Sequence, residues 1–271
     1  MSDALTQTTG SAAAITMEGV TLLSGTEAVF RDVTLTIPAR STTLVMGPSG
    51  SGKSALLKVA AGLIPPDTGA VHLLGSRLGT LGKLEERDLR RRNGFVFQDA
   101  ALWQNLSVFQ NLALPLQYHG LTERAADTER RVRGVAREFG MQRRLALRPA
   151  QLSAGERKMV SFLRAIILEP ELLFLDEPTS FVDHHGTELI VRRLRELKEG
   201  GTTMIASTHS AKISSQLADY LIVLDAGGVV ARGTFGEVVH QADRRVQEIL
   251  SDVLSEAASY DTDILDLLDD A

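Results

Sequence analysis

Two short segments of the chain combine residue types that suit phosphate chemistry, and the first is a glycine-rich loop. Residues 47–54 read GPSGSGKS and match the pattern G-x-x-x-x-G-K-[ST]. Glycines let the backbone amides of such a loop turn toward an anion, and a following helix adds a partial positive charge of about +0.5. Lys53 suits the β- and γ-phosphates of a nucleotide, and the Ser54 hydroxyl suits Mg²⁺. The expected phosphate-binding residues are Gly47, Pro48, Ser49, Gly50, Ser51, Gly52, Lys53 and Ser54.

The second segment is an apolar run, residues 172–175, that ends in the carboxylates Asp176 and Glu177. A short strand before them would place both side chains at the carboxyl edge of a sheet, where the ligands of α/β proteins bind. Hydrolysis of a phosphoanhydride needs one carboxylate for Mg²⁺ and another that orients and polarises the attacking water. We therefore predict Asp176 as a metal ligand and Glu177 as the catalytic base. A solvated acidic turn before Pro178 is the alternative.

The remaining pattern supplies the elements that would position these residues. Residues 15–23 and 29–37 alternate apolar and polar side chains and predict two antiparallel strands. Short apolar strands then alternate with helices, which predicts a mainly parallel sheet covered on both faces. The expected strands of this sheet are residues 42–46, 95–97, 172–175, 203–207 and 220–224. Because a strand precedes the glycine loop and a helix follows it, the alternative of a glycine-rich turn with an incidental lysine is disfavoured.

Three segments flank or interrupt this α/β domain, which is expected over residues 15–241. A helical block at about residues 99–167 lies between two strands and predicts an inserted helical subdomain. Residues 1–14 are rich in Ala, Ser and Thr and are expected to be a disordered lead-in and not a secretory signal. Residues 242–271 are an acidic extension, either a helix with a short apolar hook that binds a partner or the other subunit, or a disordered tail.

Composition narrows the function classes. The chain has 271 residues, of which 44% are hydrophobic and 23% charged, as in an ordinary globular protein. The formal net charge of −5 argues against nucleic acid as a partner, and the absence of cysteine excludes disulfides and thiolate metal sites. No apolar run approaches the roughly 20 residues that span a bilayer. Action at a membrane would therefore depend on a partner.

Four further motifs lie around the two phosphate-chemistry segments in a fixed order. Gln98 follows the strand at 95–97, LSAGE occupies residues 152–156, SFVD occupies residues 180–183, and His209 follows the strand at 203–207. Together these motifs resemble those of the ATP-binding subunits of ATP-binding cassette (ABC) transporters, namely the Q-loop, the signature, the D-loop and the switch histidine. The resemblance covers roughly residues 15–240. It implies a P-loop ABC ATPase fold, with an N-terminal antiparallel β-subdomain and an inserted helical subdomain, that hydrolyses ATP with Mg²⁺.

The resemblance also implies an active site shared between two subunits. Two copies of the chain, a homodimer, would enclose two ATP molecules head to tail. Ser153 and the Gly155 amide of one subunit would contact the γ-phosphate held by the glycine loop of the other, and Asp183 would couple the two sites. A small turn at a helix N-terminus suits this role because its backbone amides attract an anion.

Within each subunit, the resemblance assigns the metal site to Ser54, Gln98 and Asp176. Gln98 would also report on Mg²⁺ and the attacking water to the transmembrane partner. His209 would hold the γ-phosphate, and a structural histidine at a strand end is the alternative. The implied catalytic residues are Glu177, His209 and Lys53.

Three features depart from the pattern of the family. Ser24 stands where an aromatic side chain often stacks on adenine, which leaves the recognition of the base open. Ala154 and Glu156 replace the usual glycine and glutamine of the signature, and alanine asks more of the backbone if its φ is positive. The D-loop reads SFVD instead of SALD. None of these changes removes a catalytic group, so ATP hydrolysis is still expected.

Residues 97–116 and 242–249 are similar to the ATPases of Mla-type systems, which serve MCE-protein lipid transporters. This similarity implies phospholipid transport, with permease subunits and an MCE-type lipid-binding protein as partners, and a cytoplasmic location on the inner face of the membrane. Lipoprotein-release and amino-acid-import ATPases share part of the pattern, and a non-transport ABC ATPase such as a cluster-assembly scaffold is the alternative of a different class. The residues expected to form either a groove for the permease's coupling helix or the subdomain core are Leu102, Trp103, Leu106 and Phe109.

Overall fold

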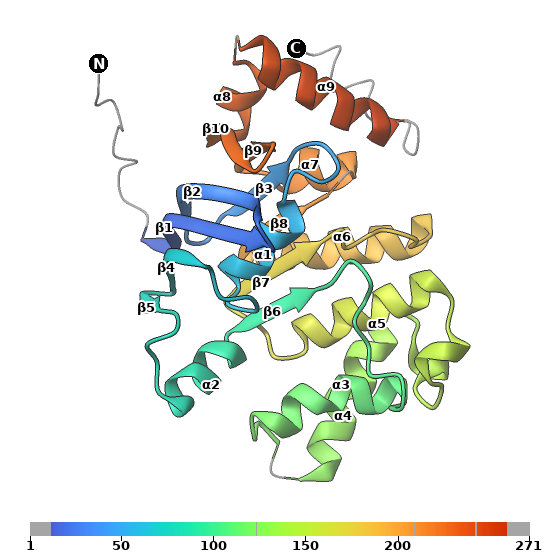
Figure 1. The fold of residues 1–271 in the computed structure, drawn as a ribbon. Coiled ribbons are helices and arrows are strands. Elements are labelled where there is room, and N and C mark those ends of the chain that lie inside the picture. Colours follow the sequence, from blue (N-terminus) through green and yellow to red (C-terminus); the bar gives the residue numbers. More distant parts are fainter. Residues whose placement is uncertain (1–11, 123, 209, 242, 259–271) are drawn as a thin grey trace.

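A computed structural model describes residues 12–122, 124–208, 210–241 and 243–258 of the chain. Its centre is a six-stranded sheet with the order β10-β9-β3-β8-β7-β6 (Figure 1). Neighbouring strands are parallel from β9 to β6, and only β10 runs antiparallel, against β9. The strands are β3 (Thr42–Met46), β6 (Asn93–Val96), β7 (Leu172–Asp176), β8 (Thr203–Ser207), β9 (Tyr220–Asp225) and β10 (Gly228–Thr234). The expectation of a mainly parallel sheet is confirmed.

A second, antiparallel sheet covers one side of the molecule with the order β2-β1-β4-β5. Its strands are β1 (Ala13–Ser24), β2 (Glu27–Pro38), β4 (Thr68–Leu73) and β5 (Ser76–Arg77). Strand β2 buries Val33, Leu35 and Ile37. The intervening Thr34 and Thr36 are exposed, so the alternating pattern gives one solvent-exposed face. Strand β1 begins at Ala13, two residues before the expected start of the strand.

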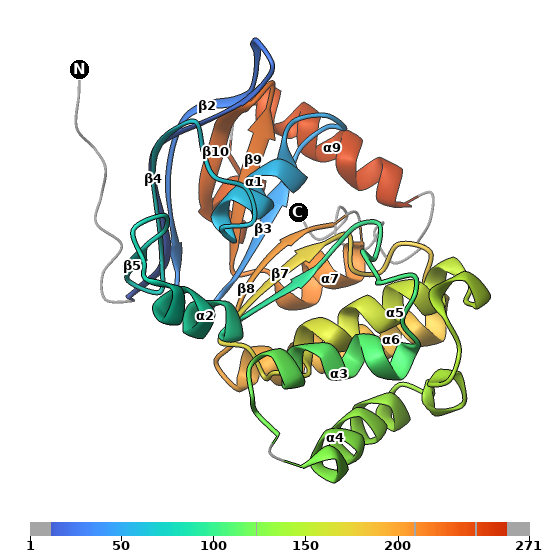
Figure 2. The same ribbon diagram turned by 60° about the horizontal axis from the view of Figure 1, so that its bottom comes forward.

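Two hydrophobic cores lie on opposite faces of the parallel sheet. Val45, Phe174 and Ile205 face the core that contains helix α1 (Lys53–Ala60) and the antiparallel sheet. Leu44 and Leu173 face the other core, to which the helices on the far side contribute (Figure 2). The near-continuous apolar strands follow from this burial on both faces.

The other helices follow the alternation that the sequence indicates, with one addition. Between β6 and β7 the described residues form three helices and two short 3-10 turns, in the interval expected for a helical insertion. Besides α1, the described helices are α2 (Lys83–Arg91), α3 (Val108–Tyr118), α4 (Ala125–Glu138), α5 (Ala154–Ile166), α6 (His184–Glu199), α7 (Ala211–Leu217), α8 (Phe235–Val239) and α9 (Arg244–Ala258). Helix α2 was not anticipated. Helix α9 buries Val246 and Leu250 in the core of the domain, so this part of the C-terminal extension is a docked helix.

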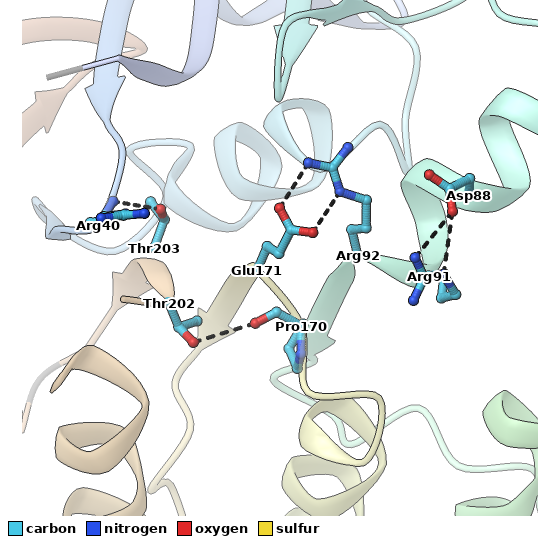
Figure 3. A network of polar contacts seen from close by, with 8 residues as sticks. All are labelled: Arg40, Asp88, Arg91, Arg92, Pro170, Glu171, Thr202 and Thr203. Atoms are coloured by element: carbon cyan, nitrogen blue, oxygen red, sulfur yellow. Dashed lines mark hydrogen bonds and ion pairs between the residues drawn. The ribbon is translucent and has the colours of Figure 1, made fainter. Parts of the chain in front are cut away.

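Polar contacts join the beginnings of four parallel strands, β6 to β7 and β3 to β8 (Figure 3). Arg92, before β6, donates from Nε and Nη2 to the carboxylate of Glu171, before β7, at 2.8 Å each. The amide of Arg40 donates to the hydroxyl of Thr203, the first residue of β8, at 2.8 Å. These contacts lie at the amino ends of the strands, and the phosphate-chemistry segments lie at the opposite, carboxyl edge.

Candidate functional site

The glycine loop connects the carboxyl end of β3 to the start of α1. Gly47 has a φ of 150°, and a Cβ there would lie 2.1 Å from the carbonyl oxygen of Leu224, so the position requires glycine. Lys53 Nζ donates to the carbonyl oxygens of Gly47 at 2.7 Å and Pro48 at 2.9 Å. The ammonium group therefore lies against the loop that the sequence predicts to bind phosphate.

Ser51 adds a polar atom inside the loop. Its side chain is 3% exposed, and its hydroxyl has no hydrogen-bond partner among the described residues. Buried hydroxyls are normally hydrogen-bonded. A phosphate oxygen would satisfy this one, which fits the predicted role of the loop.

Asp176 is the buried centre of the polar site. Its side chain is 1% exposed, and Oδ1 accepts hydrogen bonds from the Ser54 hydroxyl at 2.9 Å and the Ser207 hydroxyl at 2.6 Å. Oδ2 has no hydrogen-bond partner within the described part of the chain. Ser207 was missed by the sequence analysis. It ends strand β8, which lies between β3 and β7, so the sheet order brings it beside Asp176.

This arrangement fits a magnesium ion. Ser54 and Asp176 lie within hydrogen-bond distance, and Oδ2 of Asp176 still lacks a partner among the described residues. The described residues contain no cluster of three or more His, Cys, Asp or Glu side chains that could enclose a metal. Mg²⁺ usually takes one or two carboxylates and fills its octahedron with water and substrate phosphates, so a sparse protein site suits it.

Glu177 follows Asp176 in an unusual backbone conformation. Its φ is 48°, which is uncommon for a residue with a side chain, and its amide donates to the carbonyl oxygen of Ser207 at 3.0 Å. A left-handed turn directly after a strand costs conformational energy and is often retained at functional sites. The backbone of Glu177 is thus held in a turn directly after Asp176, at the edge of the sheet.

Gln98 lies just beyond β6, at the same carboxyl edge. The register pairs Val96 of β6 with Leu175 of β7, so the chain leaves β6 beside the Asp176 position. The carbonyl oxygens of Phe97 and Gln98 accept hydrogen bonds from Lys158, on α5. The backbone at Gln98 is therefore tied to the helix that follows the signature motif.

The signature motif begins helix α5. Ser153 is the N-cap: its hydroxyl accepts from the Glu156 amide at 3.1 Å, and Glu156 Oε2 accepts from the Ser153 amide at 2.9 Å. Glu156 Oε1 also accepts from Arg144 Nε at 2.6 Å. The backbone hydrogen bond from Ser153, aided by Arg144, holds the pKa of the Glu156 carboxyl below its usual range. Ala154 is the first helical residue and does not have a positive φ, so alanine at this position carries no conformational cost of a left-handed backbone.

The D-loop packs directly on the signature. A Cβ on Gly155 would lie 2.5 Å from the carbonyl oxygen of Phe181, so this glycine permits the close approach of the two segments. Asp183 is the N-cap of α6, and its Oδ1 accepts from the Gly186 amide at 2.7 Å. Phe181 has a φ of 66° and a side chain that is 79% exposed.

Some predicted site residues do not lie together in one site of a single chain. Helices α1 and α5 belong to the cores on opposite faces of the parallel sheet, so the glycine loop and Ser153 begin helices on opposite sides of it. His209 lies outside the described residues. Ser24 is exposed at the end of β1, where no aromatic side chain occupies its position.

The four residues expected as a docking groove or subdomain core divide between these roles. Leu102 is 8% exposed and belongs to the core, and Phe109 packs against that core. Leu106 is half-buried, whereas Trp103 is 57% exposed. The core alternative therefore holds for Leu102 and Phe109, and Trp103 is available to a partner.

The glycine loop between β3 and α1, with Asp176 at the end of a neighbouring parallel strand, defines a P-loop nucleotide-binding protein. Residues 30–180 match the model of the family described as ABC transporter, and the chain belongs to this family. The methionine import ATP-binding protein MetN of Rhizobium meliloti (strain 1021) is 36% identical over 222 residues, which are 81% of this chain and 62% of that protein. The chain thus spans less than two thirds of the length of this methionine import protein.

Further relatives match most of their own length. The molybdate/tungstate import ATP-binding protein WtpC of Archaeoglobus fulgidus is 37% identical over 77% of this chain and 83% of that protein. The arginine transport ATP-binding protein ArtP of Escherichia coli (strain K12) is 34% identical over 81% of this chain and 91% of that protein. A solved dimer of the ATP-binding cassette MJ0796, in a post-hydrolysis state with ADP and Pi, matches with a TM-score of 0.75 and 28% identity over 81% of this chain and 98% of that chain.

These comparisons confirm the ABC ATPase fold and the broad recognition of the family. None of the relatives reported above is a lipid transporter, so the more specific similarity to Mla-type ATPases is not supported. Within the described residues, no helix combines the length and apolar character needed to cross a bilayer.

Proposed function

We propose that this chain is the ATP-hydrolysing subunit of an ABC importer for a small polar solute, of which amino acids are the favoured class. The observation that carries the hydrolytic part of the proposal is the buried Asp176, held by Ser54 and Ser207 beside the glycine loop and Glu177. Two of the three relatives, those for methionine and for molybdate or tungstate, are named for import, and two of the three names refer to an amino acid. They favour this cargo over the phospholipid that the sequence suggested.

Binding of ATP would begin at the glycine loop. The loop amides, Lys53 and the Ser51 hydroxyl would bind the phosphates, with Lys53 exchanging its two carbonyl contacts for phosphate oxygens. Ser54 and Asp176 would hold Mg²⁺, which supplies charge neutralisation to the transferred phosphoryl group. Gln98 would complete this site from the neighbouring strand.

Hydrolysis would then depend on Glu177 as the general base. Its carboxylate would accept a proton from the water that attacks the γ-phosphorus, while His209 would stabilise the γ-phosphate. The fixed turn at Glu177 supports this role, since general-base catalysis requires a positioned carboxylate. ADP and inorganic phosphate would be the products.

A second copy of the chain would complete each site. The start of α5 lies on the other face of the sheet from α1, so a head-to-tail partner is the simplest source of a signature for each glycine loop. Ser153 keeps its hydroxyl proton for a phosphate oxygen because the capping bond uses the hydroxyl as an acceptor. Asp183, which caps the helix after the D-loop, would relate the two sites. The dimeric form of MJ0796 supports this assembly.

Permease subunits would hold the dimer at the inner face of the membrane. Exposed apolar side chains suited to an amphipathic helix of a permease include Trp103 and Tyr118, which are 57% and 60% exposed. Tyr118 lines a cavity together with Leu63 and Phe95, between the parallel sheet and the end of α3.

Two measurements test the proposal. Glu177→Gln should bind ATP and dimerise yet lose about 10²-fold or more in turnover, the scale of removing a general base. Hydrolysis at the wild-type rate would refute the role of Glu177. The native complex should contain a permease. In vesicles that enclose this subunit and ATP in the lumen, the complex should accumulate an amino acid from the outside. ATP-driven movement of phospholipid with an MCE-type protein would instead support phospholipid transport. A native complex that contains only soluble assembly proteins and no permease would refute a role in transport.

A further inference from the structure

Helix α5 carries a buried cation that the proposed chemistry does not use. Lys158 lies in the second turn of the helix, and its side chain is 2% exposed. Its Nζ donates to the carbonyl oxygens of Phe97 at 2.8 Å and Gln98 at 2.6 Å. Both acceptors belong to the segment that leaves β6 at the edge of the site.

Burying this ammonium group has a large cost that its surroundings must offset. Burial lowers the pKa of Lys158, whereas the carboxylates of Asp176, Glu177 and Asp99 act to raise it. Asp176 and Glu177 are the residues assigned to Mg²⁺ and to the attacking water. Lys158 therefore lies in the electrostatic field of the hydrolytic site, although it begins from a helix on one side of the sheet.

A second cation of the same helix holds the next part of the segment. Arg164 donates from Nη1 to the carbonyl oxygen of Ala101 at 2.9 Å and from Nη2 to that of Ala100 at 3.3 Å. Ala100 and Ala101 have φ values of 66° and 45°, an uncommon pair of left-handed residues with side chains. Such backbone persists only where surrounding contacts fix it. Lys158 and Arg164 of helix α5 thus donate four hydrogen bonds to carbonyl oxygens of residues 97–101, two of them at the left-handed pair.

We propose that Lys158 is a positioning residue that fixes the Gln98 backbone relative to Asp176 and Glu177 and links it mechanically to the signature motif. Helix α5 begins at the motif whose Ser153 would bind the partner's nucleotide, and five residues later it holds Gln98. A displacement of the helix on closure of the dimer is thereby passed to the Q-loop. This inference rests on the proposed function, because it assumes that Gln98 contributes to the Mg²⁺ and water site.

The test replaces Lys158 by Met, which retains most of the side-chain length and removes the donor. ATP binding should stay near the wild-type level because the glycine loop is untouched. Turnover should fall by about 10- to 100-fold, the scale of a small misplacement in an active site. The Mg²⁺ concentration for half-maximal hydrolysis should rise, which simple loss of stability would not produce. Lys83→Met, at the exposed start of α2, is the control for loss of one lysine and should match the wild type.

A second variant covers the case in which Lys158→Met does not fold. Lys158→Gln keeps an uncharged NH2 donor group on a shorter side chain and should give intermediate turnover with a raised Mg²⁺ requirement. Wild-type turnover and Mg²⁺ dependence in the folded variants would overturn the inference. Glu177→Gln, measured in parallel, separates the two failures. If it hydrolyses ATP like the wild type, the proposed function fails. If it is inactive while both Lys158 variants behave like the wild type, only the role of Lys158 fails.

Discussion

The hydrogen bond between Ser207 and Asp176 gives the most direct test of how the site is built. The donor–acceptor distance of 2.6 Å is in the range of strong hydrogen bonds to a carboxylate, and both side chains are 1% exposed. Because both side chains are buried, Ser207→Ala leaves Oδ1 of Asp176 with the Ser54 hydroxyl as its remaining hydrogen-bond partner among the described residues. A hydrogen bond to a charged group contributes about 1.5–3 kcal/mol. We expect a loss of that size in the free energy of unfolding.

For a domain of this size the loss corresponds to a fall in melting temperature of about 3–12 °C. Without the second donor the Asp176 carboxylate is less firmly oriented, so the Mg²⁺ concentration for half-maximal ATP hydrolysis should also rise. Calorimetry without nucleotide and a steady-state assay over a range of Mg²⁺ concentrations measure the two effects separately. The first reports on the folded state, and the second reports on the geometry of the site.

Ser161→Ala is the matched control. Ser161 is 0% exposed, and its hydroxyl has no hydrogen-bond partner among the described residues, so the substitution deletes the same atom from an equally buried place. Its removal should change stability by no more than about 0.5 kcal/mol or should raise it, because an unsatisfied group is lost. If Ser207→Ala melts like Ser161→Ala and keeps the wild-type Mg²⁺ dependence, Ser207 does not hold Asp176 and the account of the site is wrong.

Two further predictions concern the signature region. Gly155→Ala should lower the free energy of unfolding by about 1–3 kcal/mol, because the added Cβ would press on the Phe181 carbonyl oxygen. Gly134→Ala, in an open position of α4, is the control and should be neutral or stabilise the protein by up to about 1 kcal/mol. Equal melting temperatures of the two variants would contradict the close packing at Gly155. The lowered pKa of Glu156 means that its contribution to stability is present above the usual carboxyl pKa of 4.5 and is lost as the pH falls through the lower folded value. The melting temperatures of the wild type and Glu156→Gln should therefore converge between about pH 6 and pH 3, and a constant difference would exclude this carboxylate as the source.

The parts of the site that could be predicted from the sequence are those formed by residues that are adjacent in the chain. The glycine loop and the Asp176–Glu177 pair each combine a local motif with a strand that precedes it, so their position at the edge of a parallel sheet followed directly. Ser207 could not be found in this way, because its role depends on the order in which β3, β8 and β7 pair. That order arises from long-range pairing, which no local pattern contains.

Lys158 was missed for a different reason. In the amphipathic pattern of α5 a lysine is expected on the exposed face, since lysine is rarely buried without a partner. Its partners are two backbone carbonyls about sixty residues earlier in the chain. Because every residue has a backbone carbonyl, the residue types do not show which ones act as acceptors. Helix α2 was also missed, because its strongly charged sequence buries only Leu89 and offers little apolar periodicity.

The capping arrangement of the signature explains how a glutamate can occupy a place next to a proposed phosphate contact. A carboxylate at the third position of α5 suits the helix dipole but would repel an incoming phosphate. Both oxygens of Glu156 already accept hydrogen bonds, one from the Ser153 amide and one from Arg144, whose positive charge offsets that of the carboxylate. A separate hydrogen bond, from the Glu156 amide to the Ser153 hydroxyl, fixes the Ser153 side chain before a partner arrives, so less conformational freedom would be lost when a dimer closes. The departure from glutamine in the signature is therefore compatible with nucleotide binding because Arg144 accompanies it.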